Sequence, residues 1–264
     1  MMEKYLVDLF VASAQEQMRA PKALLRLYLS LFSPPLGKTL RLDMVKDMLT
    51  GQDLHGKRVL DVGCGIGDLS FLLAQRGAEV IGVELDEQKV ARASSIARKW
   101  HFTGLRFLAT DVTKLDQMSL GQFDAIFCVA LLEHIADDTA LLRMMQAMLR
   151  PGGIFVLEVP SARRKTIPEV EAADGHMRPG YVFEEVPSLL ASIGLRVVYQ
   201  RTMDPLGLNY YWFVSSRIAR SQKVQRWLFA LLAPFFIFLI RLSSTFIKRP
   251  GAELCFLAIK EGTV

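Results

Sequence analysis

Hydrophobic residues recur at helical spacing over the first fifty residues of the chain and then change to short, uninterrupted apolar runs. The helical spacing predicts helices over 3–19, 21–32 and 38–50, and Pro21 favours a helix start at the second of these. From residue 58 onward, the apolar runs predict strands and the stretches between them predict helices. The predicted strands are 58–62, 79–84, 106–109, 123–128 and 154–159. The predicted helices that alternate with them are 68–75, 86–101 and 137–149.

Short apolar strands that alternate with helices are typical of a parallel sheet with helices on both faces. After Pro160 the pattern predicts a loop, a helix over 183–193, a strand over 195–201 and a last strand over 254–260. The predicted fold is therefore α/β and Rossmann-like, with a seven-stranded, mostly parallel sheet.

These elements divide the chain into four parts. We predict an N-terminal helical cap over 1–51, a Rossmann-like core over 52–201, an insertion over 202–252 and a final core strand within 253–264. The 264 residues are 51% hydrophobic and carry a net charge of only +5. A chain of this length and composition can bury a large core, which excludes disorder as its main state.

Three cysteines, Cys64, Cys128 and Cys255, stand far apart in the sequence and outside any CxxC or Cys/His spacing. They cannot form a disulfide framework or a typical zinc site. The sequence therefore predicts a reducing compartment and no metal site.

Basic charge and the most apolar stretch lie together near the C-terminus. Residues 196–264 carry a net charge of +7, which leaves −2 for residues 1–195. The uncharged stretch 227–240 would extend about 21 Å as a helix, less than the roughly 30 Å hydrocarbon core of a bilayer. Four cations precede this stretch: Arg217, Arg220, Lys223 and Arg226. This arrangement favours an interfacial helix or re-entrant hairpin over a membrane span, and a helix buried against the protein's own core stays open.

Residues 61–67, Asp-Val-Gly-Cys-Gly-Ile-Gly, follow a predicted buried strand and open a predicted helix. Glycines permit a sharp turn and a close approach to a ligand, and the helix N-terminus offers free N–H groups. A dinucleotide fingerprint would require glycine at position 68, where this chain has Asp68. The acid followed by GxGxG resembles motif I of the class I S-adenosylmethionine-dependent methyltransferases.

Further segments match that family in the same order, including 123–134 and 149–153. The resemblance implies that Asp61 helps to hold the methionyl ammonium group, that Glu84 accepts from the ribose hydroxyls and that Asp111 accepts from the adenine amino group. It also implies S-adenosylmethionine as the cofactor. The remaining candidate cofactor residues lie on the same loops and strand ends: Gly63, Cys64, Gly65, Gly67, Leu85, Val112 and Val129.

Methyl transfer from a sulfonium is an in-line displacement, so a general base is required only for a hydroxyl or a protonated amine acceptor. His134 follows the fourth predicted strand and His176 lies in the loop after the fifth, at the edge where such sheets bind ligands. Both are candidate catalytic residues, and Arg178 and Tyr181 are candidate substrate-binding residues. Each has a structural alternative, because His134 can brace the next helix and the loop around His176 can order a lid.

In the family's topology the connection between the last two strands leaves the sheet at the cofactor edge, so 202–252 would overhang the active site. The chain resembles the ubiquinone-biosynthesis O-methyltransferases in particular. We therefore expect O- or N-methylation of a small or lipid-like acceptor at an anionic membrane surface. No N-terminal signal peptide is visible, which predicts a cytoplasmic protein attached peripherally or monotopically to the inner face of a membrane.

Two alternatives stay open from the sequence. One is a soluble small-molecule methyltransferase whose apolar segment forms a lid or a dimer interface, and the other is a non-catalytic cofactor-binding assembly protein. Nucleic acid is disfavoured as a partner, because the C-terminal cations flank apolar residues and do not alternate with stacking aromatics. The sequence does not determine the oligomeric state.

Overall fold

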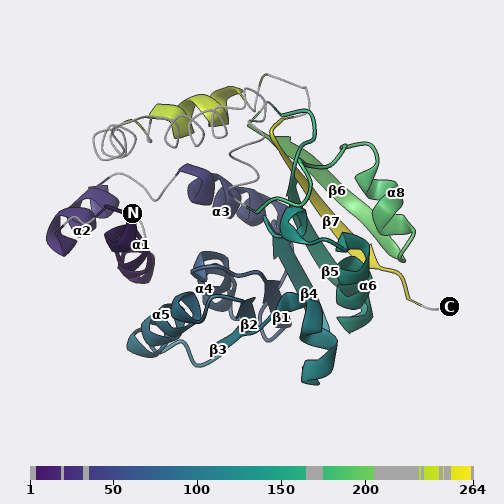
Figure 1. The fold of residues 1–264 in the computed structure, drawn as a ribbon, viewed down its shortest axis with the longest axis horizontal. Coiled ribbons are helices and arrows are strands. Elements are labelled where there is room, and N and C mark those ends of the chain that lie inside the picture. The colour runs from purple at the N-terminus through teal and green to yellow at the C-terminus, as the bar shows by residue number, and fades with distance from the viewer. Residues whose placement is uncertain are drawn as a thin grey trace.

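The computed structural model describes residues 4–18, 21–31, 36–164, 175–204, 232, 235–243, 246 and 251–262. A seven-stranded sheet with the order β3-β2-β1-β4-β5-β7-β6 forms its centre (Figure 1). The strands are β1 (Arg58–Val62), β2 (Glu79–Glu84), β3 (Leu105–Ala109), β4 (Phe123–Val129), β5 (Leu149–Pro160), β6 (Leu195–Met203) and β7 (Glu253–Lys260). The α-helices are α1 (Lys4–Met18), α2 (Lys22–Leu31), α3 (Leu36–Met48), α4 (Asp68–Gln75), α5 (Glu87–Lys99), α6 (Asp138–Met148) and α8 (Val186–Ala191). Two 3₁₀ segments, η1 (Val112–Met118) and η2 (Leu132–His134), follow β3 and β4.

The first five strands are parallel, and β7 lies antiparallel between β5 and β6. The predicted Rossmann-like class, with six strands in one direction and one reversed, is therefore confirmed. At the end of β6, Met203 pairs with Glu253 at the start of β7, and Pro160 at the end of β5 pairs with the same residue. The connection between the last two strands thus begins and ends at the carboxyl edge of the parallel strands.

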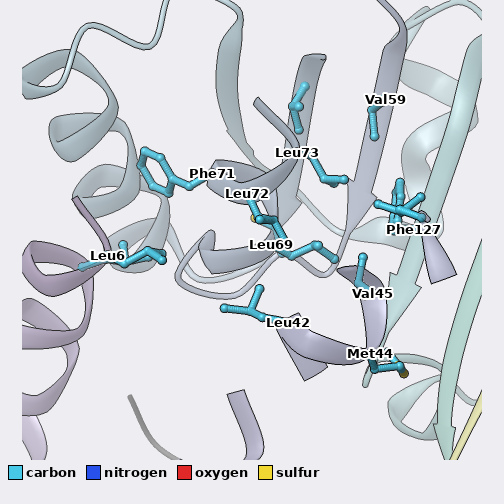
Figure 2. Packing of buried hydrophobic residues seen from close by; sticks show 14 of the residues in the cluster. Leu6, Leu42, Met44, Val45, Val59, Leu69, Phe71, Leu72, Leu73 and Phe127 are labelled. Atoms are coloured by element: carbon cyan, nitrogen blue, oxygen red, sulfur yellow. The ribbon is translucent and has the colours of Figure 1, made fainter. Parts of the chain in front are cut away.

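Hydrophobic side chains fill both faces of the sheet, because alternate residues of each strand point to opposite sides. On one face, α1, α3, α4 and α5 cover a cluster that includes Phe71 and Phe127. Figure 2 shows side chains from α1, α3 and α4 meeting strand residues such as Val59 on this face. On the other face, η1, α6 and α8 cover a second cluster that includes Phe155 and Phe256. Burial on both faces explains why the strands contain uninterrupted apolar runs.

Several predicted boundaries differ from the structure. The helix predicted over 86–101 ends at Lys99, because His101 adopts a left-handed φ of 55° that an α-helix cannot contain. The fifth strand begins at Leu149 and not at residue 154, since Leu149 already pairs with Phe123 of β4. The helix predicted over 183–193 is confined to Val186–Ala191.

The N-terminal cap is attached to the core through Asp8 of α1. The Asp8 carboxylate pairs with Lys99 of α5 and accepts from the indole of Trp100 at 3.1 Å and from Arg26 of α2 at 2.8 Å. These contacts lower the pKa of Asp8 although its partial burial acts in the opposite direction. The carboxylate thereby joins three helices, and α1 also packs Tyr5 against Phe71 of α4, with ring centroids 5.4 Å apart.

Part of the predicted insertion is described as a helix over 235–243. Ile237 and Ile240 of this helix are buried in the same cluster as α3, and Arg241 forms an ion pair with Asp43 of α3. Figure 1 shows the helix, in yellow-green, alongside α3. Half of the uncharged stretch 227–240 lies outside the described residues. Among the described residues, no helix has both the length and the apolar character that crossing a membrane requires.

Gly67 precedes α4, and its φ of 89° is one that residues with a Cβ rarely adopt. A Cβ at this position would lie 2.7 Å from the ring of Phe107 in β3. We predict that Gly67→Ala loses about 2–4 kcal/mol of unfolding free energy, because strain and overlap add together. Gly152→Ala is the matched control: its φ is 74°, but no atom lies within 4 Å of the added Cβ. The control should lose only about 1–2 kcal/mol in urea denaturation, and equal losses would contradict the overlap with Phe107.

Candidate active site

A pocket of about 480 Å³ opens at the carboxyl edge of β1, β2 and β4 and beneath α3. This volume is within the usual range for a site that holds one small molecule. The candidate catalytic residue His134 lines the pocket. Nine of the ten predicted cofactor residues line it as well: Asp61, Gly63, Cys64, Gly65, Glu84, Leu85, Asp111, Val112 and Val129. The tenth, Gly67, does not line the pocket and shapes the turn into α4 instead.

The glycine loop between β1 and α4 gives this pocket one wall made of backbone. Gly63 and Gly65 have φ values of 73° and 58°, in the left-handed region that favours glycine. A Cβ on Gly63 would lie 2.9 Å from the side chain of Leu131, whereas a Cβ on Gly65 would meet no protein atom within 4 Å. The loop therefore leaves open space beside Gly65, as a close ligand requires.

Asp61 lies in the interior of the protein, near the carboxyl end of β1, and is 2% exposed. Its Oδ2 accepts a hydrogen bond of 2.5 Å from the hydroxyl of Ser70 in α4. Burial raises the pKa of Asp61 to about 7, and the Ser70 hydrogen bond only partly opposes this effect. An ammonium group placed next to this carboxylate would compensate the cost of burying its charge.

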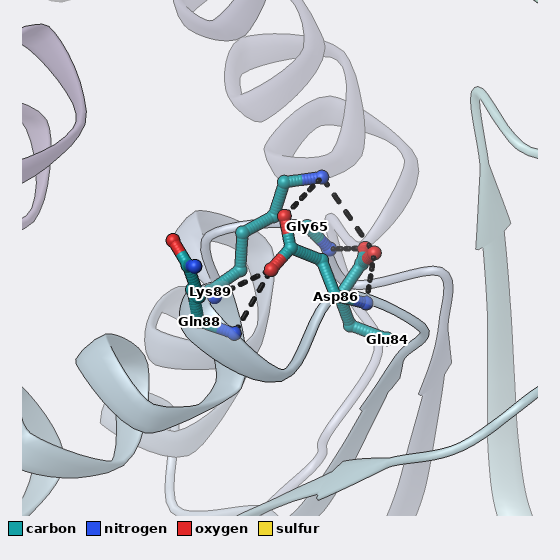
Figure 3. A network of polar contacts seen from close by, with 5 residues as sticks. All are labelled: Gly65, Glu84, Asp86, Gln88 and Lys89. Atoms are coloured by element: carbon teal, nitrogen blue, oxygen red, sulfur yellow. Dashed lines mark hydrogen bonds and ion pairs between the residues drawn. The ribbon is translucent and has the colours of Figure 1, made fainter. Parts of the chain in front are cut away.

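The Glu84 carboxylate at the end of β2 is held in place by backbone donors (Figure 3). Oε2 accepts from the amide of Gly65 at 2.9 Å, and Oε1 accepts from the amide of Asp86 at 3.1 Å. Lys89 of α5 lies 3.6 Å from Oε1. A carboxylate oxygen can accept more than one hydrogen bond. A fixed Glu84 therefore still offers acceptor sites to a pair of vicinal hydroxyls.

Asp111 directly precedes η1 and borders the pocket. Its Oδ1 accepts from the amide of Thr113 at 2.9 Å and from the hydroxyl of the same residue at 2.8 Å, which lowers the pKa of Asp111. The residue is thus a helix N-cap and a pocket residue at the same time. At the end of β4, Ala130 has a φ of 51°, a strained backbone conformation of the kind that gathers at functional sites.

Two pocket residues that the sequence interpretation missed are cations on α3. Lys38 pairs with Asp68 at 2.9 Å, and Arg41 lies 3.3 Å from Glu158, the buried acid near the end of β5. Both line the pocket and could bind a carboxylate such as that of a methionyl group. Their spacing of three residues on one helix, next to Leu42 and Val45, is the signal that could have identified them.

The two candidate catalytic histidines lie against one another. The ring centroids of His134 and His176 are 4.7 Å apart, at an interplanar angle of 89°. His134 Nδ1 lies 3.3 Å from the carbonyl oxygen of Gly175, and His176 Nδ1 lies 3.4 Å from an Nη of Arg164. Only His134 is among the residues that line the cofactor pocket.

Three acids form a buried cluster, of which Glu133 lies next to the two histidines: Glu133, Glu158 and Glu253. Burial and the charge of Glu158 raise the pKa of Glu133 to about 7, and the same causes raise that of Glu253. Oε2 of Glu133 has no hydrogen-bond partner within the described structure. The cluster draws on η2, β5 and β7, which is why no local sequence pattern could reveal it.

Glu133, His134 and His176 also bring together ligand-type atoms within 4.8 Å of one another. This convergence was not visible in the sequence, because residue 176 stands far from the other two. The prediction that the protein has no metal site stays a prediction.

The structure places the two predicted substrate-binding residues in a network around Asp138 of α6. The hydroxyl of Tyr181 donates to Asp138 at 2.7 Å, Arg178 pairs with the same carboxylate, and the Arg178 guanidinium lies 4.1 Å from the centroid of the Tyr181 ring. Tyr181 is only 4% exposed, and its backbone bridges to Ser161 after β5. This geometry favours ordering of the loop that carries His176, so acceptor binding by this pair stays a prediction.

The pocket residues fit S-adenosylmethionine. One cavity contains Asp61 for an ammonium group, Glu84 for a ribose and Asp111 for an adenine, in the order of these groups in the cofactor. The glycine wall beside Gly65 leaves open space for the ligand. Lys38 and Arg41 of α3 could bind the carboxylate of the methionyl group.

We predict that Asp61→Asn weakens binding of S-adenosylmethionine by about tenfold to a hundredfold, since a hydrogen-bonded charge contact is lost. Affinity of the unaltered protein should fall as the pH drops below the Asp61 pKa of about 7, because the protonated acid cannot pair with an ammonium group. Titration calorimetry one unit above and one unit below that pKa would measure both effects, and the variant should not show this pH dependence.

Asp61→Asn, which should weaken cofactor binding, should increase the stability of the protein without cofactor. The pKa of Asp61 is higher in the folded protein than its ordinary value, so folding favours the protonated form and stability decreases as the pH rises toward about 7. Without cofactor and above that pH, Asp61→Asn should therefore raise the melting temperature. A lower melting temperature would show that the carboxylate serves the fold and not the ligand.

Comparison with known proteins agrees with this site. A family model described as "Methyltransferase domain" matches residues 53–205. The ubiquinone biosynthesis O-methyltransferase of Acinetobacter baumannii is 34% identical over 114 residues, which cover 43% of this chain and 47% of that protein. The enzyme of the same name from Psychrobacter arcticus is 39% identical over 114 residues, covering 43% and 44% of the two chains. These alignments span about half the length of the curated relatives.

Solved structures share the fold at low sequence identity. A putative sarcosine dimethylglycine methyltransferase from Galdieria sulphuraria has a TM-score of 0.61 and 14% identity, covering 85% of this chain and 86% of that one. Magnesium protoporphyrin IX methyltransferase from Synechocystis PCC 6803, with bound S-adenosylmethionine, has a TM-score of 0.54 and 18% identity, covering 85% and 80%. Since the family match covers more than half of the chain, this protein belongs to the methyltransferase family, with a class I Rossmann-like fold and S-adenosylmethionine as its cofactor.

Proposed function

We propose that this protein transfers a methyl group from S-adenosylmethionine to a hydroxyl or amine of a small, lipid-like acceptor at the inner surface of a membrane. The observation that carries the proposal is the single pocket in which nine predicted cofactor residues meet His134. The curated relatives named above support an O-methyl acceptor of the ubiquinone-precursor type, although their similarity covers only about half of each chain.

When bound, S-adenosylmethionine supplies an activated methyl group on a sulfonium. The protein's own contribution is alignment and proton removal. Asp61, Glu84 and Asp111 would hold the ammonium group, the ribose and the adenine of the cofactor, while the loop at Ala130 and Leu131 forms the wall next to His134. A hydroxyl held beside His134 could then give up its proton as the oxygen–carbon bond forms and the carbon–sulfur bond breaks.

The hydrogen bond of His134 determines which of its nitrogens can act as the base. A carbonyl oxygen only accepts, so the 3.3 Å contact with Gly175 requires the proton on Nδ1 and leaves the Nε2 lone pair available. Nε2 lies 4.0 Å from Oε1 of Glu133. His176 Nδ1, in contrast, accepts from Arg164, so the neutral ring carries its proton on Nε2 and its one lone pair is already used. His134 is therefore the stronger candidate for the base.

Support for a membrane surface comes from an exposed apolar stripe on the helix over 235–243 and its described neighbours. Phe235, Phe238, Leu242 and Phe246 are 57%, 60%, 44% and 74% exposed, and they recur at intervals of three and four residues. Ile240, on the opposite side of the helix, is 1% exposed and packs with the core. An amphipathic helix of this kind is suited to the boundary between headgroups and acyl chains. The net charge of +7 over residues 196–264 favours an anionic surface.

We predict that His134→Gln lowers the turnover number by about a hundredfold or more, since general-base catalysis contributes that much. Binding of S-adenosylmethionine should stay within about threefold of the unaltered value, because a residue beside the acceptor does not hold the cofactor. The assay is transfer of radiolabelled methyl from the cofactor to total membrane lipid extract. His176→Gln is the matched comparison and should impair turnover less. Loss of activity with a chelator and its recovery with a metal that imidazole binds, such as zinc or nickel, would instead assign these side chains to a metal.

We predict that Phe235→Ser combined with Phe238→Ser reduces sedimentation with phosphatidylcholine vesicles by at least about tenfold, because two exposed rings no longer enter the bilayer. A matched control, Val198→Ser with Tyr199→Ser, removes two exposed apolar side chains from β6 instead. It should bind vesicles as the unaltered chain does. If the phenylalanine variant keeps its vesicle binding but loses a dimer, the stripe is an interface between copies of a soluble enzyme and the membrane proposal is wrong.

A further inference from the structure

Helix α3 separates two cavities. Lys38, Arg41 and Leu42 face the cofactor pocket, whereas Leu40 and Met44 line a second groove of about 400 Å³ on the other side of the helix. This groove lies between α3, the end of β6 and the helix over 235–243. None of the groove's lining residues belongs to the cofactor pocket.

The groove has an apolar floor built from three elements. Leu40 and Met44 come from α3, Met203 from the last position of β6 and Ile240 from the helix over 235–243. All four side chains are buried, and the two methionines are flexible enough to adapt to an occupant of irregular shape. A floor of this kind suits a hydrocarbon chain.

The rim of the groove is charged and has an excess of cations. Lys46, Arg201 and Arg241 stand there with two acids, Asp43 and Asp47. Arg201 reaches Asp47 at 2.7 Å through one Nη, and Arg241 pairs with Asp43. Within the described part of the chain, the Lys46 ammonium has no hydrogen bond or ion pair. The rim therefore carries a net charge of +1 at neutral pH.

The rim cations could accept an anion at little cost. The side chains of Arg201 and Asp47 are 37% and 58% exposed, and ion pairs in such positions contribute only about 0–1 kcal/mol. A guanidinium has five N–H donors, so Arg201 can keep Asp47 and bind a phosphate oxygen as well. Lys46 adds a second cation to the same rim.

We propose that this groove binds one anionic phospholipid, with its phosphate between Lys46 and Arg201 and the upper part of an acyl chain on the apolar floor. The inference rests on the proposed membrane function, because it places the headgroup site at the base of the helix whose outer face carries Phe235 and Phe238. The stripe would enter the bilayer while the groove, on the inner side of the same helix, holds a headgroup. Membrane attachment would then depend on headgroup charge as well as on apolar area.

The test measures binding of the full chain to phosphatidylcholine vesicles with and without phosphatidylglycerol. A cation near an anionic surface contributes about 1 kcal/mol, or about fivefold in affinity. Lys46→Gln with Arg201→Gln should therefore remove about twenty-five-fold of the gain that phosphatidylglycerol gives, and leave binding to pure phosphatidylcholine unchanged.

Lys57→Gln with Arg196→Gln is the matched control, because both cations lie outside the groove and Arg196 is on the same strand as Arg201. It should retain the gain. An equal loss in the control would show diffuse attraction and overturn the groove. Circular dichroism and binding of S-adenosylmethionine verify that each variant is folded.

Three further results would each contradict the inference in a different way. If phosphatidylglycerol gives no gain while phosphatidylcholine vesicles still bind, the groove is not a headgroup site, but the proposed membrane function stands. If glycerol phosphate in solution binds the protein and phosphatidylglycerol in vesicles still gives no gain, the groove binds free phosphate esters and not a lipid. If no vesicle binds at all, the proposed membrane function is wrong, and the inference that rests on it is wrong as well.

Discussion

The parallel arrangement of five strands is the constraint on which the rest of this structure depends. Because β1 to β5 run in one direction, their carboxyl ends reach a single edge, and the loops that follow them meet there. Asp61, Glu84, Asp111 and His134 are far apart in the sequence and yet line one pocket. The reversed β7 brings both ends of the long connection after Met203 to the same edge.

The cost of this arrangement is a set of buried charges near the site. Asp61 is almost fully buried, and its pKa of about 7 shows that the protein holds this carboxylate in an unfavourable state. The pKa of Glu133, beside the candidate base, is also raised to about 7, and its Oε2 lacks a partner within the described structure. Strain at Ala130 adds to this set. Such features lower stability without a ligand, and they are expected where binding and catalysis require them.

The sequence was sufficient to predict the sheet and most of the residues that line the pocket, because both depend on local signals. The strands Arg58–Val62 and Glu79–Glu84 match their predicted bounds, because the short apolar run that predicts each strand coincides with the strand itself. The sequence was not sufficient to predict the contacts around His134 and His176, where the acceptor is proposed to bind. The contact of Arg41 with Glu158, and the position of His176 against His134, join segments whose separation along the chain carries no periodic signal. The Asp138 partner of Tyr181 likewise came only from the structure.

The most direct test of the central claim is a calorimetric titration of the full chain with S-adenosylmethionine and, separately, with NAD. A pocket that has Asp68 in place of the third fingerprint glycine, and that presents a buried acid to an ammonium group, should give saturable heat with S-adenosylmethionine and none with NAD. Saturable binding of NAD, with no heat from S-adenosylmethionine, would contradict the account of this site.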